Sequence, residues 1–130
     1  MTAEIVWITE AVILAIHDEQ LAQHGGATGL RDAGLLQAAM ARPKQRAAYA
    51  NPDLAELAAL HALAIAQNHP FIDGNKRTAL VALELFLALN GQSLGAGDAD
   101  TVLAILAMAA GTISDDDFIA WVRRHAASQA

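Results

Sequence analysis

Two apolar segments of this 130-residue chain meet at one polar stretch, His69-Pro70-Phe71-Ile72-Asp73-Gly74-Asn75-Lys76-Arg77-Thr78-Ala79. The helical pattern before it ends at Asn68, because a proline restricts the backbone of the residue that precedes it. A second apolar pattern follows and continues to position 90. The sequence therefore predicts a polar loop between two helices, and such a junction is the expected place for a functional site.

The composition predicts one helical domain that spans residues 1–130. Apolar residues make up 55% of the chain and aromatic residues only 5%, so we expect a core of closely packed Ala, Leu, Ile and Val. A chain of this length buries roughly two-thirds of its unfolded surface. The absence of cysteine excludes disulfides and thiolate metal sites, and it fits a reducing cytoplasm.

Charge and hydropathy exclude two classes of function. The net charge of −6 with only eight Lys and Arg argues against a nucleic-acid surface. The apolar runs are short or contain Glu10 or Glu84, so we expect no membrane span of about 20 residues. Residues 1–4 lack the basic region of a secretory signal. The expected location is the cytoplasm.

Cap residues and glycines divide the chain into about six helices, which gives an all-α fold. We expect an extended lead-in or short strand over 5–8, and Thr9, Asp32, Asn51 and Ser114 as N-caps. Asp98 or Asp100 is expected to cap the fifth helix. The expected helices are 10–23, a short one from 33 that closes before Pro43, 52–68, 75–90, one from 98 or 100 to 111, and one from 115 to a basic end at 123–125. A further helical turn is expected over 45–49.

The two helices beside the polar loop are expected to lie at the centre of the fold. The segment 52–68 is apolar on nearly all faces, and 75–90 is similar except for Glu84. A helix without a wide polar face lies inside a domain. His61 within the first of these helices is interpreted as a core histidine.

The residue types in the loop suit phosphate chemistry. Gly74 and Asn75 allow a tight turn, and the free N–H groups at the start of the next helix bind anions. Lys76 and Arg77 lie where the helix dipole disfavours positive charge, and a bound phosphate would reverse that penalty. His69 could act as a base near neutral pH.

Asp73 completes this set, because one carboxylate together with phosphate oxygens suits Mg²⁺. Each feature also has an ordinary structural explanation. A His before Pro often caps a helix, Asp-Gly-Asn is commonly a turn, and Lys-Arg is commonly a solvated face. Their combination within nine residues favours a phosphoryl-transfer site.

The stretch from His69 to Arg77 resembles the signature of the Fic superfamily, His-x-Phe-x-Asp/Glu-Gly-Asn-x-Arg. The segment from Asn75 to Leu80 is similar to the death-on-curing (Doc) toxins of type II toxin–antitoxin systems within that superfamily. Further similar positions run along the chain: Leu14–Asp18, Gly25-Gly26 with Gly29, Arg46 with Tyr49, and Ala109–Ser114. The resemblance implies a single Fic-like helical bundle.

The resemblance also implies roles for individual residues. His69 is expected to be the general base that deprotonates a hydroxyl of a target protein, and Phe71 a buried anchor of the loop. Asp73 is expected to bind Mg²⁺. The expected anion hole consists of Gly74, Asn75 and Lys76, while Arg77 adds charge stabilisation. Arg46 and Tyr49 fall where Fic proteins dock their targets, and His17 with Asp18 is expected to orient the structure.

One position favours phosphoryl transfer over AMP transfer. AMP-transferring Fic proteins carry a second Arg where this chain has Leu80, and usually Gly where it has Lys76. Doc-like proteins lack that Arg and resemble kinases that present the γ-phosphate of ATP. The implied substrate is a Thr of elongation factor Tu, so that translation stops. Pro70 and Gly74 resemble the general Fic signature, which keeps an AMP transferase as an alternative.

A catalytically silent binding module is a second alternative, although retention of the whole signature argues against it. The chain contains no Ser/Thr-x-x-x-Glu sequence, the self-inhibitory pattern of many Fic proteins. The resemblance therefore implies an antitoxin protein in trans, which binds an apolar groove that the sequence does not locate.

Overall fold

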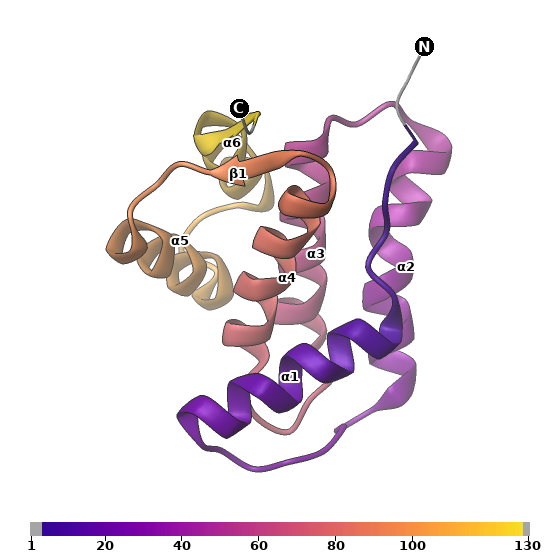
Figure 1. Ribbon diagram of the computed structural model, residues 1–130, viewed down its shortest axis with the longest axis vertical. Helices are drawn as coiled ribbons and strands as arrows, with labels where there is room; N and C mark the ends of the chain where they lie inside the picture. The colour runs from indigo at the N-terminus through magenta and orange to yellow at the C-terminus, as the bar shows by residue number, and fades with distance from the viewer. Residues whose placement is uncertain (1–3, 129–130) are drawn as a thin grey trace.

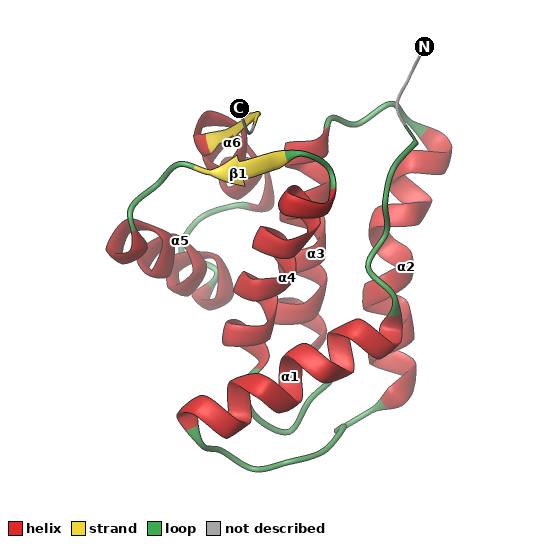
Figure 2. Cartoon of the chain, viewed as in Figure 1, coloured by secondary structure: helices red, strands yellow, loops and turns green. Residues whose placement is uncertain are grey.

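The computed structural model describes residues 4–128. The expectation of no secretory signal concerned residues 1–4, and residues 1–3 lie outside the described residues. Eight elements follow one another along the chain. They are α1 (Glu10–His24), α2 (Ala33–Tyr49), α3 (Leu54–Asn68), α4 (Asn75–Leu89), β1 (Gln92–Leu94), α5 (Asp98–Ala110), α6 (Asp115–His125) and β2 (Ala126–Ser128). Figures 1 and 2 show a helical bundle, which confirms the expected fold class.

Helix α3 forms the centre of the bundle. Every residue from Ala55 to Ala66 is buried except the partly exposed Glu56. The helix packs against α2, α4 and α6, so it is covered on several sides, and α4 runs alongside it in Figure 1. The many alanines of α3 allow the neighbouring helices to approach closely, because a small side chain keeps two helix axes near each other.

Side-chain caps start three helices where the sequence predicts them. The side chains of Thr9, Asp32 and Ser114 accept hydrogen bonds from backbone N–H groups in the first turns of α1, α2 and α6. Ile8 and Ile13 on either side of the Thr9 cap are both buried, as a hydrophobic staple requires. These contacts fix where the chain enters each helix.

The expectation that the second helix closes before Pro43 is wrong. Helix α2 continues through Pro43 to Tyr49 as one helix. Proline removes one intrahelical hydrogen bond, but Pro43 lies on the buried face of α2 together with Leu36 and Ala39. Packing of this face against α3 outweighs the local preference, so the helix does not end at the proline.

Two further caps differ from the prediction. Asp53 rather than Asn51 caps α3, because its Oδ1 accepts the Glu56 N–H at 2.9 Å. Helix α5 begins after Gly97 without a side-chain cap, and Asp98 and Asp100 lie inside its first turn. Carboxylates there still favour the helix, since they face the positive end of its dipole.

Helix α4 is buried on one face only, which corrects the expectation that it resembles α3. Thr78, Ala82 and Phe86 face the core, while Lys76, Arg77 and Glu84 are exposed. The amphipathic pattern leaves one side of α4 open to form a site wall. The expected central pair is therefore one helix, α3, that is buried over most of its length and one helix, α4, that is half-buried.

A small two-stranded sheet also departs from the prediction of helices alone. Strand β1 pairs antiparallel with β2, and Ser93 lies opposite Ala127. The segment 5–8 is extended without forming a strand, and Asn90 holds it through hydrogen bonds with the N–H and carbonyl of Val6. In the described residues no helix has the length and apolar character that crossing a bilayer requires.

Candidate active site

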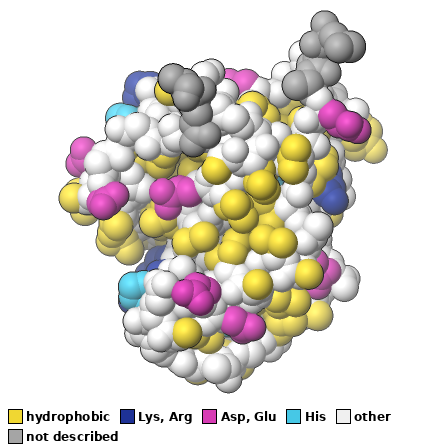
Figure 3. All heavy atoms as spheres, viewed as in Figure 1, with side chains coloured by type: hydrophobic (Ala, Val, Ile, Leu, Met, Phe, Trp, Pro, Cys, Tyr) yellow, Lys and Arg dark blue, Asp and Glu magenta, His cyan; other side chains and the backbone are white. Residues whose placement is uncertain are grey.

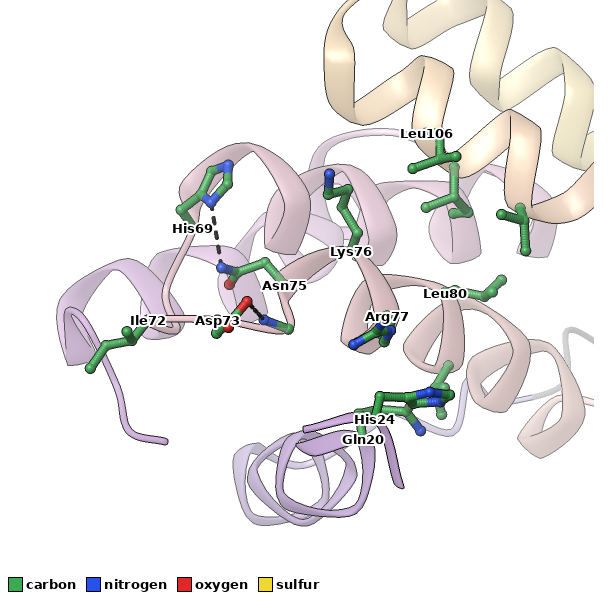
Figure 4. Close-up of a pocket in the computed structure, with 14 residues that line it drawn as sticks. Gln20, His24, His69, Ile72, Asp73, Asn75, Lys76, Arg77, Leu80 and Leu106 are labelled. Carbon is green, nitrogen blue, oxygen red and sulfur yellow. Dashed lines mark hydrogen bonds between the residues drawn. The ribbon is translucent and has the colours of Figure 1, made fainter. Parts of the chain in front are cut away.

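The predicted polar loop connects the C-terminus of α3 to the N-terminus of α4, and its side chains line one cavity (Figure 4). Gly74 takes a left-handed conformation (φ 78°) at the N-cap of α4 and has no side chain to cap the helix. The N–H groups of Asn75, Lys76 and Arg77 consequently have no acceptor within residues 4–128. Such donors at a helix N-terminus suit an anion, and we call this segment the anion-binding turn. Of the expected set, Asn75 and Lys76 have such N–H groups, whereas the Gly74 N–H donates to Oδ1 of Asp73 and Arg77 provides the third donor.

His69 caps α3 in a conformation that is unusual for its residue type. Its φ of 49° and ψ of 56° are left-handed, and it is the one non-glycine residue within 4–128 with a positive φ. Such a backbone costs roughly 1–3 kcal/mol and persists only where its surroundings hold it. In this conformation His69 lines the cavity, and its ring lies beside the Asn75 amide (Figure 4).

Asn75 holds the two ends of the loop together. Its Oδ1 accepts the N–H of Phe71 at 3.0 Å, and its Nδ2 donates to the carbonyl of Phe71 at 2.9 Å. The same Nδ2 lies 3.4 Å from Nδ1 of His69. The Asn75 side chain therefore shapes the loop, whereas its backbone N–H belongs to the anion-binding turn.

Phe71 anchors the loop in the core. Its side chain is 1% exposed and stacks on the ring of His17 with centroids 3.7 Å apart. Nε2 of His17 lies 2.8 Å from the carbonyl oxygen of Asp73. The buried His17 thus holds both sides of the loop, as the prediction of an orienting role requires.

The Asp73 carboxylate is held by two backbone donors. Its Oδ1 accepts the N–H of Gly74 at 3.0 Å, and its Oδ2 accepts the N–H of Ala27 at 3.3 Å. The backbone of Gly26 lies so close that an added Cβ would stand 2.8 Å from Oδ2. The segment between α1 and α2 therefore forms part of the carboxylate's surroundings.

The donor set around Asp73 fits a metal that a nucleotide helps to hold. Within residues 4–128 no group of three or more His, Cys, Asp or Glu residues could bind a metal alone. Mg²⁺ commonly takes one or two protein carboxylates together with phosphate oxygens and water. Asp73 beside the anion-binding turn meets that requirement.

Lys76 and Arg77 give the site its positive charge. Both are exposed, and in the described part of the chain neither forms an ion pair. They stand in the first turn of α4, where the helix dipole already contributes positive charge. An anion in the cavity would meet two cations and three N–H donors together.

The cavity has a volume of about 630 Å³, within the usual range of small-molecule sites. One wall carries the loop residues, and another is apolar, formed by Leu80 and Val81 of α4 with residues of α5. Gln20 and His24 of α1 line the side near Arg77 (Figure 4). Figure 3 shows hydrophobic side chains gathered over the centre of the molecular face where α4 lies between α1 and α5. The large apolar residues of α5 that are exposed are Val102, Leu103 and Leu106.

Arg46 and Tyr49 lie away from this cavity. Arg46 forms an ion pair of 2.6 Å with Glu56 in the first turn of α3, and Tyr49 is 91% exposed. From Glu56 to Asn68 the helix rises about 18 Å, so these residues stand near the opposite end of α3 from the loop. Both line a second, open hollow with Asp115 and Asp116. A target-docking role for them stays a prediction.

His61 is a core residue, as predicted. It is 2% exposed, packs against Phe86 and Trp7, and its Nδ1 bonds the carbonyl of Leu57 at 2.7 Å. Burial lowers the pKa of His61 to about 4, with the nearby Lys44 as a smaller cause. The residue stays neutral at physiological pH and has no place in the candidate site.

The segment 26–32 is a site component that the sequence does not identify. It provides the Ala27 N–H for Asp73, and Arg31 for the carbonyls at the end of α3. The glycines at 25, 26 and 29 indicated a turn, but no sequence pattern placed that turn against the loop. The sequence does not identify Gln20 and His24 either, because nothing in the pattern of α1 shows which of its sides faces the loop.

Residues 7–87 match the sequence model of the Fic/DOC family. The chain belongs to this family. It is 40% identical over 85 residues to "Protein kinase doc" of Escherichia phage P1, covering 65% of this chain and 68% of that protein. It is 48% identical over 75 residues to "Toxin Doc" of Mycolicibacterium smegmatis, covering 55% of this chain and 57% of that protein. As a Fic/DOC member, the chain carries the family signature on the loop described above.

Proposed function

We propose that the protein is a Doc-type toxin that acts as a Mg²⁺-dependent protein kinase. It transfers the γ-phosphate of ATP to a Ser or Thr hydroxyl of a translation factor such as elongation factor Tu, and so stops translation in the cytoplasm. The single observation that carries this proposal is the loop geometry. A base, a carboxylate, two cations and three N–H donors that have no acceptor in the described part of the chain line one cavity. The names of the phage and mycobacterial relatives, a Doc protein kinase and a Doc toxin, support the same function.

The residues divide the chemistry between them. His69 accepts the proton of the target hydroxyl, whose oxygen then attacks the γ-phosphorus while the bond to the ADP oxygen breaks. The N–H groups of the anion-binding turn, together with Lys76 and Arg77, stabilise the charge on the phosphate oxygens. Mg²⁺ held by Asp73 would neutralise further phosphate charge.

The structure bears on the alternative of AMP transfer through Leu80. This residue lines the apolar wall of the cavity, so in that position no cation is available to hold terminal phosphates. Gly74, which resembles the general Fic signature, has a local explanation, because its φ of 78° favours glycine in any branch. Phosphoryl transfer is therefore the preferred reaction.

Radiolabelled ATP tests the proposal. The protein is incubated with purified elongation factor Tu, Mg²⁺ and either γ-labelled or α-labelled ATP, and His69→Ala serves as the matched control. We expect label on the factor from the γ-position alone, and a loss of about 10²–10⁴-fold in rate for His69→Ala, as removal of a general base costs. Label from the α-position would replace the proposal by AMP transfer, and no label from either would favour a silent module.

We also propose an antitoxin protein as a partner in trans. The names of the relatives support a toxin role, and the apolar wall next to Lys76 and Arg77 suits an amphipathic helix with acidic residues. Expression of the intact protein is expected to arrest bacterial growth, while His69→Ala is not. Co-expression of a small neighbouring open reading frame should restore growth, and equal growth of the two variants would contradict the toxin role.

A further inference from the structure

Arg31 binds three successive carbonyl groups at the C-terminus of α3 and just beyond it. Its Nη2 donates to the carbonyl of Asn68 at 2.9 Å, and its Nε donates to the carbonyl of His69 at 2.7 Å. Its backbone N–H donates to the carbonyl of Pro70, also at 2.7 Å. One residue thus holds the backbone immediately before, at and after His69.

These carbonyls need such a partner. The last carbonyl groups of a helix have no intrahelical donor, and they carry the negative end of the helix dipole. A guanidinium group suits this position because it is always charged and its N–H groups point in fixed directions. Arg31 can therefore hold two carbonyl oxygens in a defined relative orientation, which a single ammonium group cannot reproduce.

The left-handed backbone of His69 makes this orientation important for the site. The φ of 49° is sterically disfavoured for a residue with a Cβ, so the surroundings must stabilise it. The rest of the segment 26–32 strengthens the same contact. Asp32 N–H also donates to the Pro70 carbonyl at 3.1 Å, and Leu30 forms a β-bridge with Phe71.

We propose that Arg31 is a positioning residue, which fixes the backbone of His69 in its left-handed conformation and so directs the imidazole at the target hydroxyl. This inference rests on the proposed kinase activity. Arg31 itself touches neither nucleotide nor target. Its effect is on the rate of the transfer step rather than on the binding of ATP.

Steady-state kinetics of Arg31→Ala test the inference. We expect kcat to fall by about 10- to 100-fold, because displacing a reacting group by about 1 Å costs up to about 100-fold. The KM for ATP should stay within about twofold, since the anion-binding turn is intact. Arg31→Lys should recover only part of kcat, and millimolar guanidinium should partly restore Arg31→Ala, because the side chain is exposed.

Arg123→Ala is the matched control. Arg123 also donates two hydrogen bonds, at 2.7 and 3.2 Å, but to the Asp53 carboxylate at the far end of α3. We expect a similar small loss of thermal stability in both variants and an unchanged kcat for Arg123→Ala. An Arg31→Ala enzyme with unchanged kcat, or an equal loss of kcat in both variants, would overturn the inference.

Histidine side-chain NMR separates this inference from the proposed function. The ring signals of His69 are assigned with the His69→Ala variant, and their shifts are compared in Arg31→Ala and Arg123→Ala. Displacement of the His69 signals in Arg31→Ala alone supports the positioning role even if the wild-type protein transfers no phosphate. Unmoved signals would refute it, whatever the activity.

Discussion

Replacement of Gly26 by alanine (Gly26→Ala) would bring a methyl group against the Asp73 carboxylate. A Cβ at this position lies 2.8 Å from Oδ2 of Asp73 and 3.0 Å from Cδ2 of Leu21. Its φ of 123° also lies in a region that L-residues avoid. The substitution therefore combines backbone strain with a direct collision at the proposed metal ligand.

The size of the two effects follows from the geometry. Backbone strain costs roughly 1–3 kcal/mol, which for a domain of this size lowers Tm by about 4–12 °C. Relief of the collision to an ordinary contact of 3.4 Å requires the carboxylate to move by about 0.6 Å. Changes to the residues that orient a metal ligand typically cost about 10- to 100-fold in metal affinity, so we expect Mg²⁺ to be bound about 10-fold more weakly.

Gly29→Ala separates strain from collision. Gly29 has a similar φ of 109°, but its added Cβ would meet only Cδ1 of Ile72, at an ordinary 3.5 Å. Phosphate transfer is measured as a function of Mg²⁺ concentration for both variants, and thermal shifts with and without Mg²⁺ and ATP provide a readout that needs no turnover. Both variants should lose stability, and only Gly26→Ala should need more Mg²⁺.

A Mg²⁺ dependence that stays at the wild-type value in both Gly26→Ala and Gly29→Ala would refute the reasoning. In that case the Asp73 carboxylate either moves without consequence or does not hold the metal. A loss of Mg²⁺ affinity in both variants would assign the effect to distortion of the whole segment 26–32 instead of to the single contact with Oδ2.

Three further outcomes are expected. The pKa of His61 is about 4 in the folded protein and 6.5 in the unfolded chain. As pH falls below 6.5, the unfolded chain is protonated first, so the free energy of unfolding decreases until about pH 4. The loss reaches about 2 kcal/mol at pH 5 and should be absent in His61→Phe when urea unfolding is compared at pH 7 and pH 5. Asp53→Ala should lower the free energy of unfolding by about 1 kcal/mol, because α3 loses its cap. Asp53→Asn should lower it by less, because asparagine keeps the cap and only weakens the pair with Arg123. Equal losses in the two variants would contradict this explanation. Asn75→Asp keeps the shape of the side chain but places a carboxylate oxygen against the Phe71 carbonyl, where the amide donates in the wild type. The variant should lose at least about 1–3 kcal/mol of stability in thermal unfolding and should be less active. A Tm equal to that of the wild type would refute the role of the amide.

The sequence predicted those features that depend on neighbouring residues. The caps formed by Thr9, Asp32 and Ser114 could be predicted because each is a hydrogen bond to a residue only three positions further along the chain. The loop from His69 to Arg77 could be located because Pro70 and Gly74 interrupt two apolar patterns. The burial of Phe71 came from the family resemblance and is confirmed.

Features that depend on distant contacts could not be predicted in the same way. Pro43 remains helical because its face packs against α3, which local propensity does not reveal. Ala27 reaches Asp73 across 46 positions, and Arg31 reaches His69 across 38. Such pairings arise only when α1 and α2 bring the connecting segment against the loop, so a single sequence offers no signal for them.

Lys76 and Arg77 at the start of α4 form no ion pair with any other described residue, and this affects how the stability of the protein is measured. Their positive charges lie close together at the positive end of the α4 dipole, so this electrostatic repulsion lowers the stability of the protein when no anion is bound. Inorganic phosphate or sulfate can relieve it without being a substrate, and stabilisation grows with the logarithm of anion concentration. Melting temperatures measured in phosphate buffer would then overstate the stability of the free protein and conceal part of the shift that ATP produces.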